Sequence, residues 1–288
     1  MSAGTSELPP WTSPARVQDW EAILDECNSW IRTFPDNPKS SDFGRRGWGE
    51  MYLGRLHEAL KDLKQADLLH ATELAQRYGP GKMWSGLNQA HATVRMLLGD
   101  ARLASQALRE EMKAILEWYD CFTDAAGGVG AGLLLWYIAV REQDKALEEE
   151  ALSYLARIRE SKPKEKFDRW PRHLADFVLG KLNFAALLEG AFGSMNLNEL
   201  ERRAYIERPA PAPGEVPKFN PDDPPTGLLL RGHLARALFY GGIKARRTDP
   251  AIGESLLRRC IQLKDVDIEN EWYLSFLELG LVDPASFR

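Results

Sequence analysis

Histidines and carboxylates are the side chains in this sequence that could do acid–base or metal chemistry. Acidic runs such as Glu148–Glu150 and Asp222–Asp223 are typical of solvated helix surfaces. None of the five histidines lies in an HExxH pair or another spacing typical of metal ligands. They are His57, His70, His91, His173 and His233. We therefore expect no bound metal or other cofactor. An enzyme site formed by distant helices, for example by His91, His173 and nearby acids, stays an alternative.

Nucleophiles and phosphate-binding loops give no stronger indication of an enzyme. The glycine-rich stretch Gly127–Gly132 follows a helical pattern instead of a buried strand, and no P-loop Lys-Ser/Thr comes after it, so we interpret it as an inter-helix loop. Cys27, Cys121 and Cys260 form no CxxC pair and are predicted to be free, buried cysteines. No GxSxG motif is present. The sequence predicts a protein without catalytic residues.

Composition sets the class of molecule. The chain has 288 residues, of which 44% are hydrophobic and 27% charged, as in ordinary globular proteins. Its formal net charge of -5 gives no reason to expect a nucleic-acid partner, and arginine pairs such as Arg45-Arg46 and Arg258-Arg259 are interpreted as solvated helix faces. No signal peptide and no run of about 18 apolar residues is visible, which predicts a cytoplasmic protein without a membrane segment.

The elements that would position a binding site begin with a helical hairpin over Ser41–Leu69. Gly54 stands where the first helix should end with a positive φ, and Gly47 would allow a close approach between helices. Ala59, Leu63 and Ala66 follow at i, i+4 and i+7 and predict one face of the second helix. A hairpin of this kind buries its faces by stacking on others, and such stacks usually bind partners.

This hairpin resembles a tetratricopeptide repeat, with Phe43 at the large anchor position and with Gly47, Gly54, Ala59 and Ala66 at the small positions. It departs from the repeat at Ala71, where a closing proline is expected. The segment Trp20–Asn37 resembles the second helix of a preceding repeat, and Trp170–Gly193 resembles a late element of bacterial tetratricopeptide-like adaptor proteins. Six tryptophans stand at helical spacing among aliphatic residues, and most of them are predicted to be core, while one or two left exposed in a groove would mark the site. They are Trp20, Trp30, Trp84, Trp118, Trp136 and Trp170.

Further turn signals extend the pattern. Gly99-Asp100, Gln143-Asp144 and Thr248–Pro250 each separate two helical segments. The resemblance then implies an all-α fold, a tetratricopeptide-like solenoid of about five or six hairpins closed by a C-terminal capping helix. The predicted organisation has four parts: a flexible N-terminus at 1–15, hairpins over 16–207, a proline-rich linker or internal groove ligand at 208–226, and a last hairpin with its cap at 227–288.

In the family that the hairpin resembles, the first helix of each repeat lines a concave groove. Carried over by position, this implies partner contacts at Arg45, Trp48, Met51, Tyr52 and, in the next hairpin, Gln89. Whether Trp48 lies in the groove or in the core stays open, as does the oligomeric state. The resemblance implies a non-catalytic adaptor or scaffold that binds a protein or peptide. An intracellular immunity protein or secretion chaperone that neutralises a cognate partner is the alternative.

Overall fold

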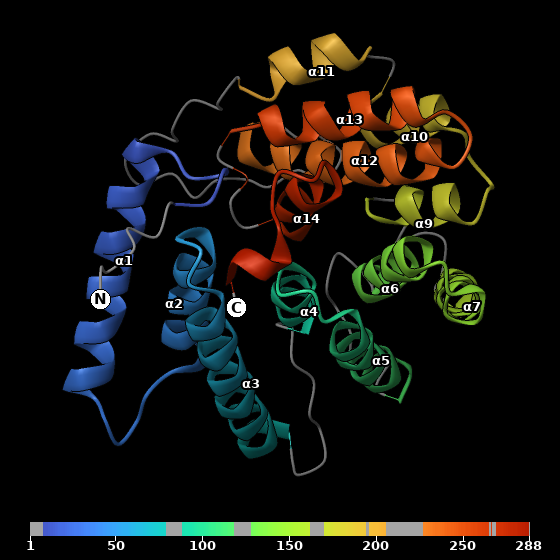
Figure 1. Cartoon of the computed structure of the whole chain (residues 1–288). Helices are drawn as coiled ribbons and strands as arrows, with labels where there is room; N and C mark the ends of the chain where they lie inside the picture. The colour runs from blue at the N-terminus through green and yellow to red at the C-terminus, as the bar shows by residue number, and fades with distance from the viewer. Residues whose placement is uncertain are drawn as a thin grey trace, which may run out of the picture. The chain divides into compact units, whose positions relative to one another are not determined.

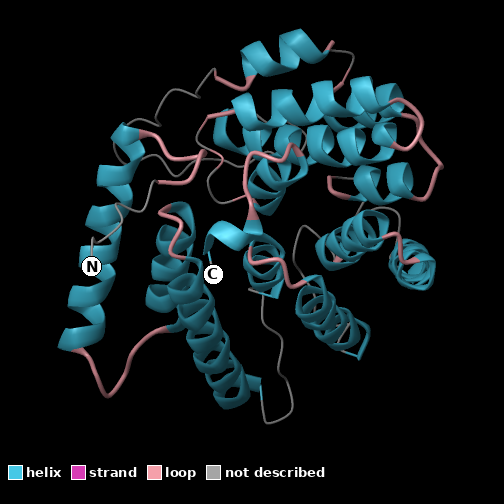
Figure 2. Cartoon of the chain, in the orientation of Figure 1, coloured by secondary structure: helices cyan, strands magenta, loops and turns pink. Residues whose placement is uncertain are grey.

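The computed structural model describes residues 8–78, 88–117, 128–161, 170–193, 196–205, 227–264, 266 and 269–287. Every regular element within these ranges is a helix, and none of the described residues forms a strand (Figure 2). The prediction of an all-α fold is confirmed. The proline-rich segment 208–226, Cys121 and Gly127 lie outside the described residues.

Contacts group the chain into two compact units. Unit 1 comprises residues 1–123, 130–151 and 276–288, and unit 2 comprises 124–129 and 152–275. Neither unit is a continuous stretch of sequence, since the chain passes between them more than once. The two units are defined by contacts within the chain, and their bounds differ from those of the predicted hairpin region 16–207 and last hairpin 227–288. That division of the chain stays a prediction.

Unit 1 is built from consecutive helices of the N-terminal half and from the end of the chain (Figure 1). Helix α1 packs on α2, α2 on α3, α3 on α4 and α4 on α5. The bounds of these helices are α1 Pro14–Thr33, α2 Ser40–Tyr52, α3 Leu56–Tyr78, α4 Asn88–Leu97 and α5 Ala101–Glu117. Unit 1 also holds most of α6 Val129–Glu142, the start of α7 Lys145–Ser161, and a 3-10 turn at Pro284–Phe287.

The α2/α3 hairpin forms as the glycine pattern predicts. Gly54 has a φ of 78° and its N–H donates to the Met51 carbonyl, which ends α2. A Cβ added to Gly47 would lie 2.9 Å from Leu63 Cγ, so the close helix approach requires glycine. The turns at Gly99, with a φ of 77°, and at Gln143, with a φ of 56°, are also present.

The N-terminal segment is more ordered than its composition suggests. Residues 1–7 lie outside the described part, but Trp11, within the segment predicted to be flexible, is only 4% exposed. Its indole N–H donates to the Tyr52 carbonyl at 2.8 Å, and its ring contacts Phe276 edge-on and stacks on Phe287. The beginning and the end of the chain thus share one core within unit 1.

Unit 2 is also helical. Helix α9 packs on α10, and α12 packs on α13, α9, α10 and α11. The turn predicted at Thr248–Pro250 is confirmed, because the Asp249 carboxylate caps α13 by accepting from the Ala251 and Ile252 N–H groups. The bounds are α9 Arg172–Val178, α10 Phe184–Phe192, α11 Leu197–Arg203, α12 Gly227–Arg246, α13 Pro250–Gln262 and α14 Asn270–Glu278.

Candidate binding groove

Two of the predicted partner-binding residues lie in the core. Met51 is fully buried and Tyr52 is 2% exposed, so the expectation that they face a groove is wrong. Tyr52 packs on the Trp20 ring with a centroid separation of 5.9 Å, and its hydroxyl accepts a hydrogen bond from the Ser13 N–H at 2.9 Å. The carry-over by position failed because α1 covers this face of α2.

The other three predicted residues are dispersed. The Arg45 side chain is exposed and pairs with Glu26 at 3.2 Å, while Trp48 is half-buried. Gln89 on α4 donates from its amide to Glu111 on α5 at 2.9 Å. A Cβ added to Gly130 would lie 2.4 Å from the Gln89 side-chain oxygen. Gly130 stands within α6, which corrects the interpretation of Gly127–Gly132 as a loop over its described part. Partner binding by these residues stays a prediction.

Trp30 belongs to the six tryptophans of which most were predicted to be core, and it is 49% exposed. Trp84 and Trp118 lie outside the described residues. The buried face of α1 carries Trp20, Leu24 and Cys27, at i, i+4 and i+7. Trp30 falls beside this stripe instead of on it, and its ring stacks on the equally exposed Phe34 at 5.4 Å.

A groove in unit 1 is lined by side chains of α3, α4 and α5. Its volume is about 450 Å³, within the usual range for ligand pockets. Each helix contributes side chains spaced three or four residues apart, which therefore share one helix face. Its lining includes Lys64, Asp67 and Leu68 on α3, His91 and Arg95 on α4, and Glu110 on α5.

Asp67 and His91 form a buried pair in the wall of the groove. Asp67 Oδ2 lies 3.1 Å from His91 Nε2, and the side chains are only 17% and 8% exposed. Despite this distance, His91 Nε2 makes no hydrogen bond with a described residue, and Asp67 Oδ1 has no partner among the described residues either. The His91 ring hydrogen-bonds instead to the Leu63 carbonyl.

Burial moves both groups of this pair toward their neutral forms. Desolvation raises the pKa of Asp67 to about 7. Desolvation, reinforced by the nearby charges of Arg95 and Lys64, lowers the pKa of His91 to about 4, against the opposing effect of the Leu63 carbonyl. Between these values the pair is therefore an uncharged carboxylic acid beside an uncharged imidazole, and not an ion pair.

Two cations line the same groove without a protein partner. Within the described part of the chain, neither Lys64 nor Arg95 makes a hydrogen bond or an ion pair, and Arg95 Nε is buried without an acceptor. A partly buried guanidinium without an acceptor is unfavourable, and a carboxylate would satisfy it with two parallel hydrogen bonds. Glu110, at the α5 side of the groove, accepts from the Gln106 amide at 3.1 Å.

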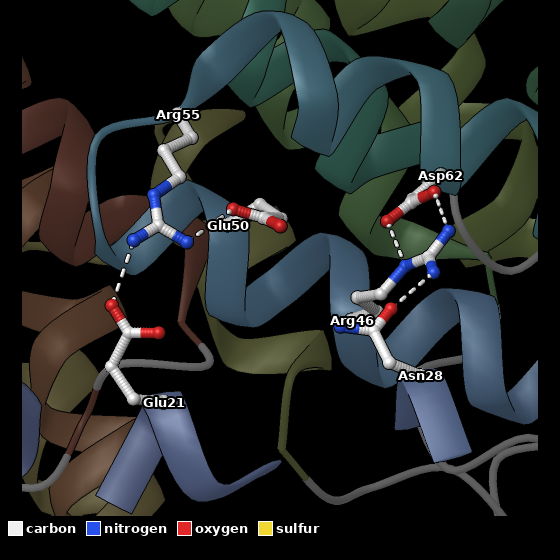
Figure 3. A network of polar contacts seen from close by, with 6 residues as sticks. All are labelled: Glu21, Asn28, Arg46, Glu50, Arg55 and Asp62. Atoms are coloured by element: carbon white, nitrogen blue, oxygen red, sulfur yellow. Dashed lines mark hydrogen bonds and ion pairs between the residues drawn. The ribbon is translucent and has the colours of Figure 1, made fainter. Parts of the chain in front are cut away.

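Arg46 shows how a half-buried arginine of this unit is usually satisfied (Figure 3). Its Nε and Nη2 donate to the two oxygens of Asp62 on α3 at 2.6 and 2.7 Å, and Nη1 donates to Asn28 on α1 at 2.7 Å. The hydrogen bond with Asp62 raises the pKa of Arg46. The prediction that Arg45-Arg46 is simply a solvated face is therefore wrong for Arg46. Arg259 likewise pairs with Glu201, at 2.6 Å.

Asp67 is the groove residue that sequence reasoning missed. It follows Ala66, on the buried stripe of the second helix, and this polar position beside an apolar face was the available signal. Its partner His91 is on another helix, so no sequence spacing connects the two. The described residues contain no group of three or more His, Cys, Asp or Glu that could hold a metal ion. Nor does any helix in the described part have the length and apolar character needed to cross a membrane.

Comparisons of the chain with protein-family models, with curated proteins and with solved structures found no match. The function proposed below therefore depends on the residues of the groove themselves.

Proposed function

We propose that this chain is a non-catalytic binding protein, an adaptor or scaffold, which holds a short acidic and apolar segment of a partner protein in the α3–α5 groove. The observation that carries this proposal is the presence of two cations, Lys64 and Arg95, that have no partner among the described residues and lie beside Leu68, which is 61% exposed. The cations suit a carboxylate and Leu68 suits an apolar side chain. A volume of about 450 Å³ accommodates a few side chains and not a folded domain.

Other ligand classes fit the groove less well. A nucleic-acid backbone would place phosphates against Asp67 and Glu110 as well as the two cations, on a chain with a formal net charge of -5. Acid–base catalysis by His91 is also disfavoured. Its ring hydrogen-bonds to the Leu63 carbonyl and its Nε2 lies beside Asp67, so neither nitrogen is directed at a ligand.

The proposal includes the tetratricopeptide-like solenoid. Four pairs of consecutive helices pack as hairpins, which supports this arrangement. They are α2/α3, α4/α5, α9/α10 and α12/α13. The buried, free thiols of Cys27 and Cys260 suit a reducing compartment such as the cytoplasm. An immunity protein or secretion chaperone would be a narrower form of the same function, with one cognate partner.

Photo-crosslinking in the cells that make the protein tests the partner. A photoreactive amino acid at position 68 should give a discrete adduct, whereas the same group at position 252, where Ile252 is 53% exposed on α13, should not. The adduct should disappear when Arg95→Glu is added. Mass spectrometry should place the crosslink next to an acidic side chain of the partner. Equal adducts at both positions would contradict the proposal.

A peptide titration tests the ligand class directly. We expect acetyl-Leu-Glu-Leu-amide to shift the methyl NMR signals of Ala71 and Ala107, which line the groove, with a dissociation constant on the order of millimolar. The glutamine peptide acetyl-Leu-Gln-Leu-amide should bind several-fold more weakly, and Arg95→Gln should remove this difference. Equal binding of the two peptides to the unsubstituted protein would rule out recognition of a carboxylate.

A further inference from the structure

The Asp67–His91 pair stands next to the two cations that would take an acidic ligand. Both Lys64 and Arg95 act on His91 electrostatically, so the four groups share one neighbourhood of the groove. With Asp67 protonated, the pair is uncharged and the two cations define the potential there. With Asp67 ionised, a negative charge lies in the wall beside them.

We propose that the Asp67–His91 pair links ligand binding to protons: the groove holds an acidic ligand when Asp67 is protonated and releases it when Asp67 loses its proton. This regulation rests on the proposed function of the groove. It stands on the geometry of two buried groups 3.1 Å apart, of which Asp67 Oδ1 and His91 Nε2 have no hydrogen-bond partner in the described part of the chain. No hydrogen bond from a described residue stabilises the charge that forms on Asp67 Oδ1, so that charge acts on the ligand.

The contact with Leu63 determines which group of the pair changes charge. The Leu63 carbonyl holds the ring N–H of a neutral His91, and the nearby cations oppose a second proton on the ring. Desolvation raises the pKa of the Asp67 carboxyl to about 7, so this group titrates near neutral pH. Asp67 therefore ionises as the pH rises, while His91 stays neutral.

The other charged groups that face the pair come from the same three helices. Lys64 on α3, Arg95 on α4 and Glu110 on α5 line the same groove, while the raised pKa of Asp67 has burial as its cause. His70 stands one helical turn beyond Asp67 on α3 and lies 3.6 Å from Glu73. His70 is therefore the neighbouring histidine that has to be controlled for in a pH experiment.

The thermodynamic linkage between ligand binding and protonation of Asp67 gives the proposal a magnitude. Any ligand that binds better to protonated Asp67 must raise the pKa of Asp67 by the same factor. We expect the affinity for acetyl-Leu-Glu-Leu-amide to fall about three- to tenfold between pH 6 and pH 8, the range that a nearby unit charge produces in a partly solvated groove. The blocked peptide has no terminal charges and its glutamate is ionised throughout this range, so the ligand itself does not titrate.

Peptide affinity between pH 6 and pH 8, together with NMR titration of the Asp67 carboxyl carbon with and without peptide, tests the proposal. Asp67→Asn should bind at pH 8 as tightly as the unsubstituted protein binds at pH 6, with a flat profile. Glu110→Gln, which removes another carboxylate from the groove, and His70→Gln should both keep the pH dependence. The signal of Asp67 should titrate near neutral pH and move to higher pH when peptide is added.

Three results would overturn the proposal. A pH profile that persists in Asp67→Asn, or that vanishes in His70→Gln, would assign the dependence to another group. An Asp67 carboxyl that titrates near pH 4 would remove the switch. Binding of the peptide with no pH dependence would leave the proposed function intact and contradict the proton linkage alone, whereas absence of binding at every pH would contradict both.

Discussion

At the scale of single residues, the charge state of Asp67 depends on its burial without a hydrogen-bond partner. Asp67 lies beside His91, at a distance of 3.1 Å between Oδ2 and Nε2 that by itself would suggest an ion pair. The carboxylate makes no hydrogen bond with the ring, so desolvation dominates and the neutral acid is favoured. The neutral pair holds one proton, on Asp67.

The stability of the Asp67→Asn and His91→Gln variants should depend on pH in opposite directions. Between about pH 4 and pH 6.5 the native pair holds one proton on Asp67, and the unfolded chain also holds one, on His91, so the two contributions cancel. In Asp67→Asn only the lowered pKa of His91 remains, and the free energy of unfolding should rise with pH. In His91→Gln only the raised pKa of Asp67 remains. Its stabilisation is present at low pH and is lost as the pH rises toward about 7.

Urea unfolding of the three proteins across this range gives the measurement. Each variant's curve, taken relative to the unsubstituted protein, should have a slope of up to about 1.4 kcal/mol per pH unit. Three parallel curves would mean that folding does not shift the pKa of either Asp67 or His91.

At the scale of elements, polar contacts join α1, α2 and α3 in two places (Figure 3). Arg46 connects α2 with Asp62 on α3 and Asn28 on α1, and Arg55, before α3, pairs with Glu21 on α1 at 2.7 Å. The Asp62 side chain is only 7% exposed, whereas the Arg55 pair is half exposed. The Arg46 contacts therefore carry more of the energy that orders these helices.

Arg46→Met should destabilise unit 1 by about 3 kcal/mol, because it leaves the Asp62 carboxylate buried and unpaired. The neighbouring substitution Arg45→Met removes an ion pair in which both side chains are 51% exposed, so it should cost less than about 1 kcal/mol. Chemical denaturation monitored by circular dichroism measures both. Equal effects of the two substitutions would show that the buried position of Asp62 does not matter.

At the scale of the whole molecule, unit 1 depends on both ends of the chain. Trp11 contacts Tyr52 of the first hairpin and the rings of Phe276 and Phe287, which lie far along the sequence. Glu278, near the same end, accepts a hydrogen bond from the Tyr137 hydroxyl at 2.9 Å. Phe276, Glu278 and Phe287 thus join the C-terminal part of the chain to the core of unit 1.

Trp11→Ala should therefore lower the stability of unit 1 by about 3–5 kcal/mol, the usual effect of removing a buried tryptophan. Trp30→Ala, at a position that is 49% exposed, should cost less than about 1 kcal/mol. Thermal unfolding followed by circular dichroism compares the two. If Trp11→Ala behaved like Trp30→Ala, the contacts of Trp11 with the end of the chain would contribute little to folding.

Local patterns in the sequence were sufficient for the first hairpin and for the turns at Gly99, Gln143 and Thr248–Pro250, but not for the start of α6 at Val129. The positive φ at Gly54 and Gly99 and the close approach at Gly47 follow from properties of glycine that act within a few residues. The all-α fold could be predicted for the same reason, because helical periodicity is a local property.

Only the tertiary structure decided which helix faces are covered and which polar groups meet. Tyr52 and Met51 were predicted for a groove and are buried, because α1 covers α2. The sequence also did not tell which tryptophans are exposed, and Trp30 is one of them. Asp67 and His91 meet only because α3 and α4 pack side by side. The charge state of that pair depends on desolvation, which no sequence spacing encodes.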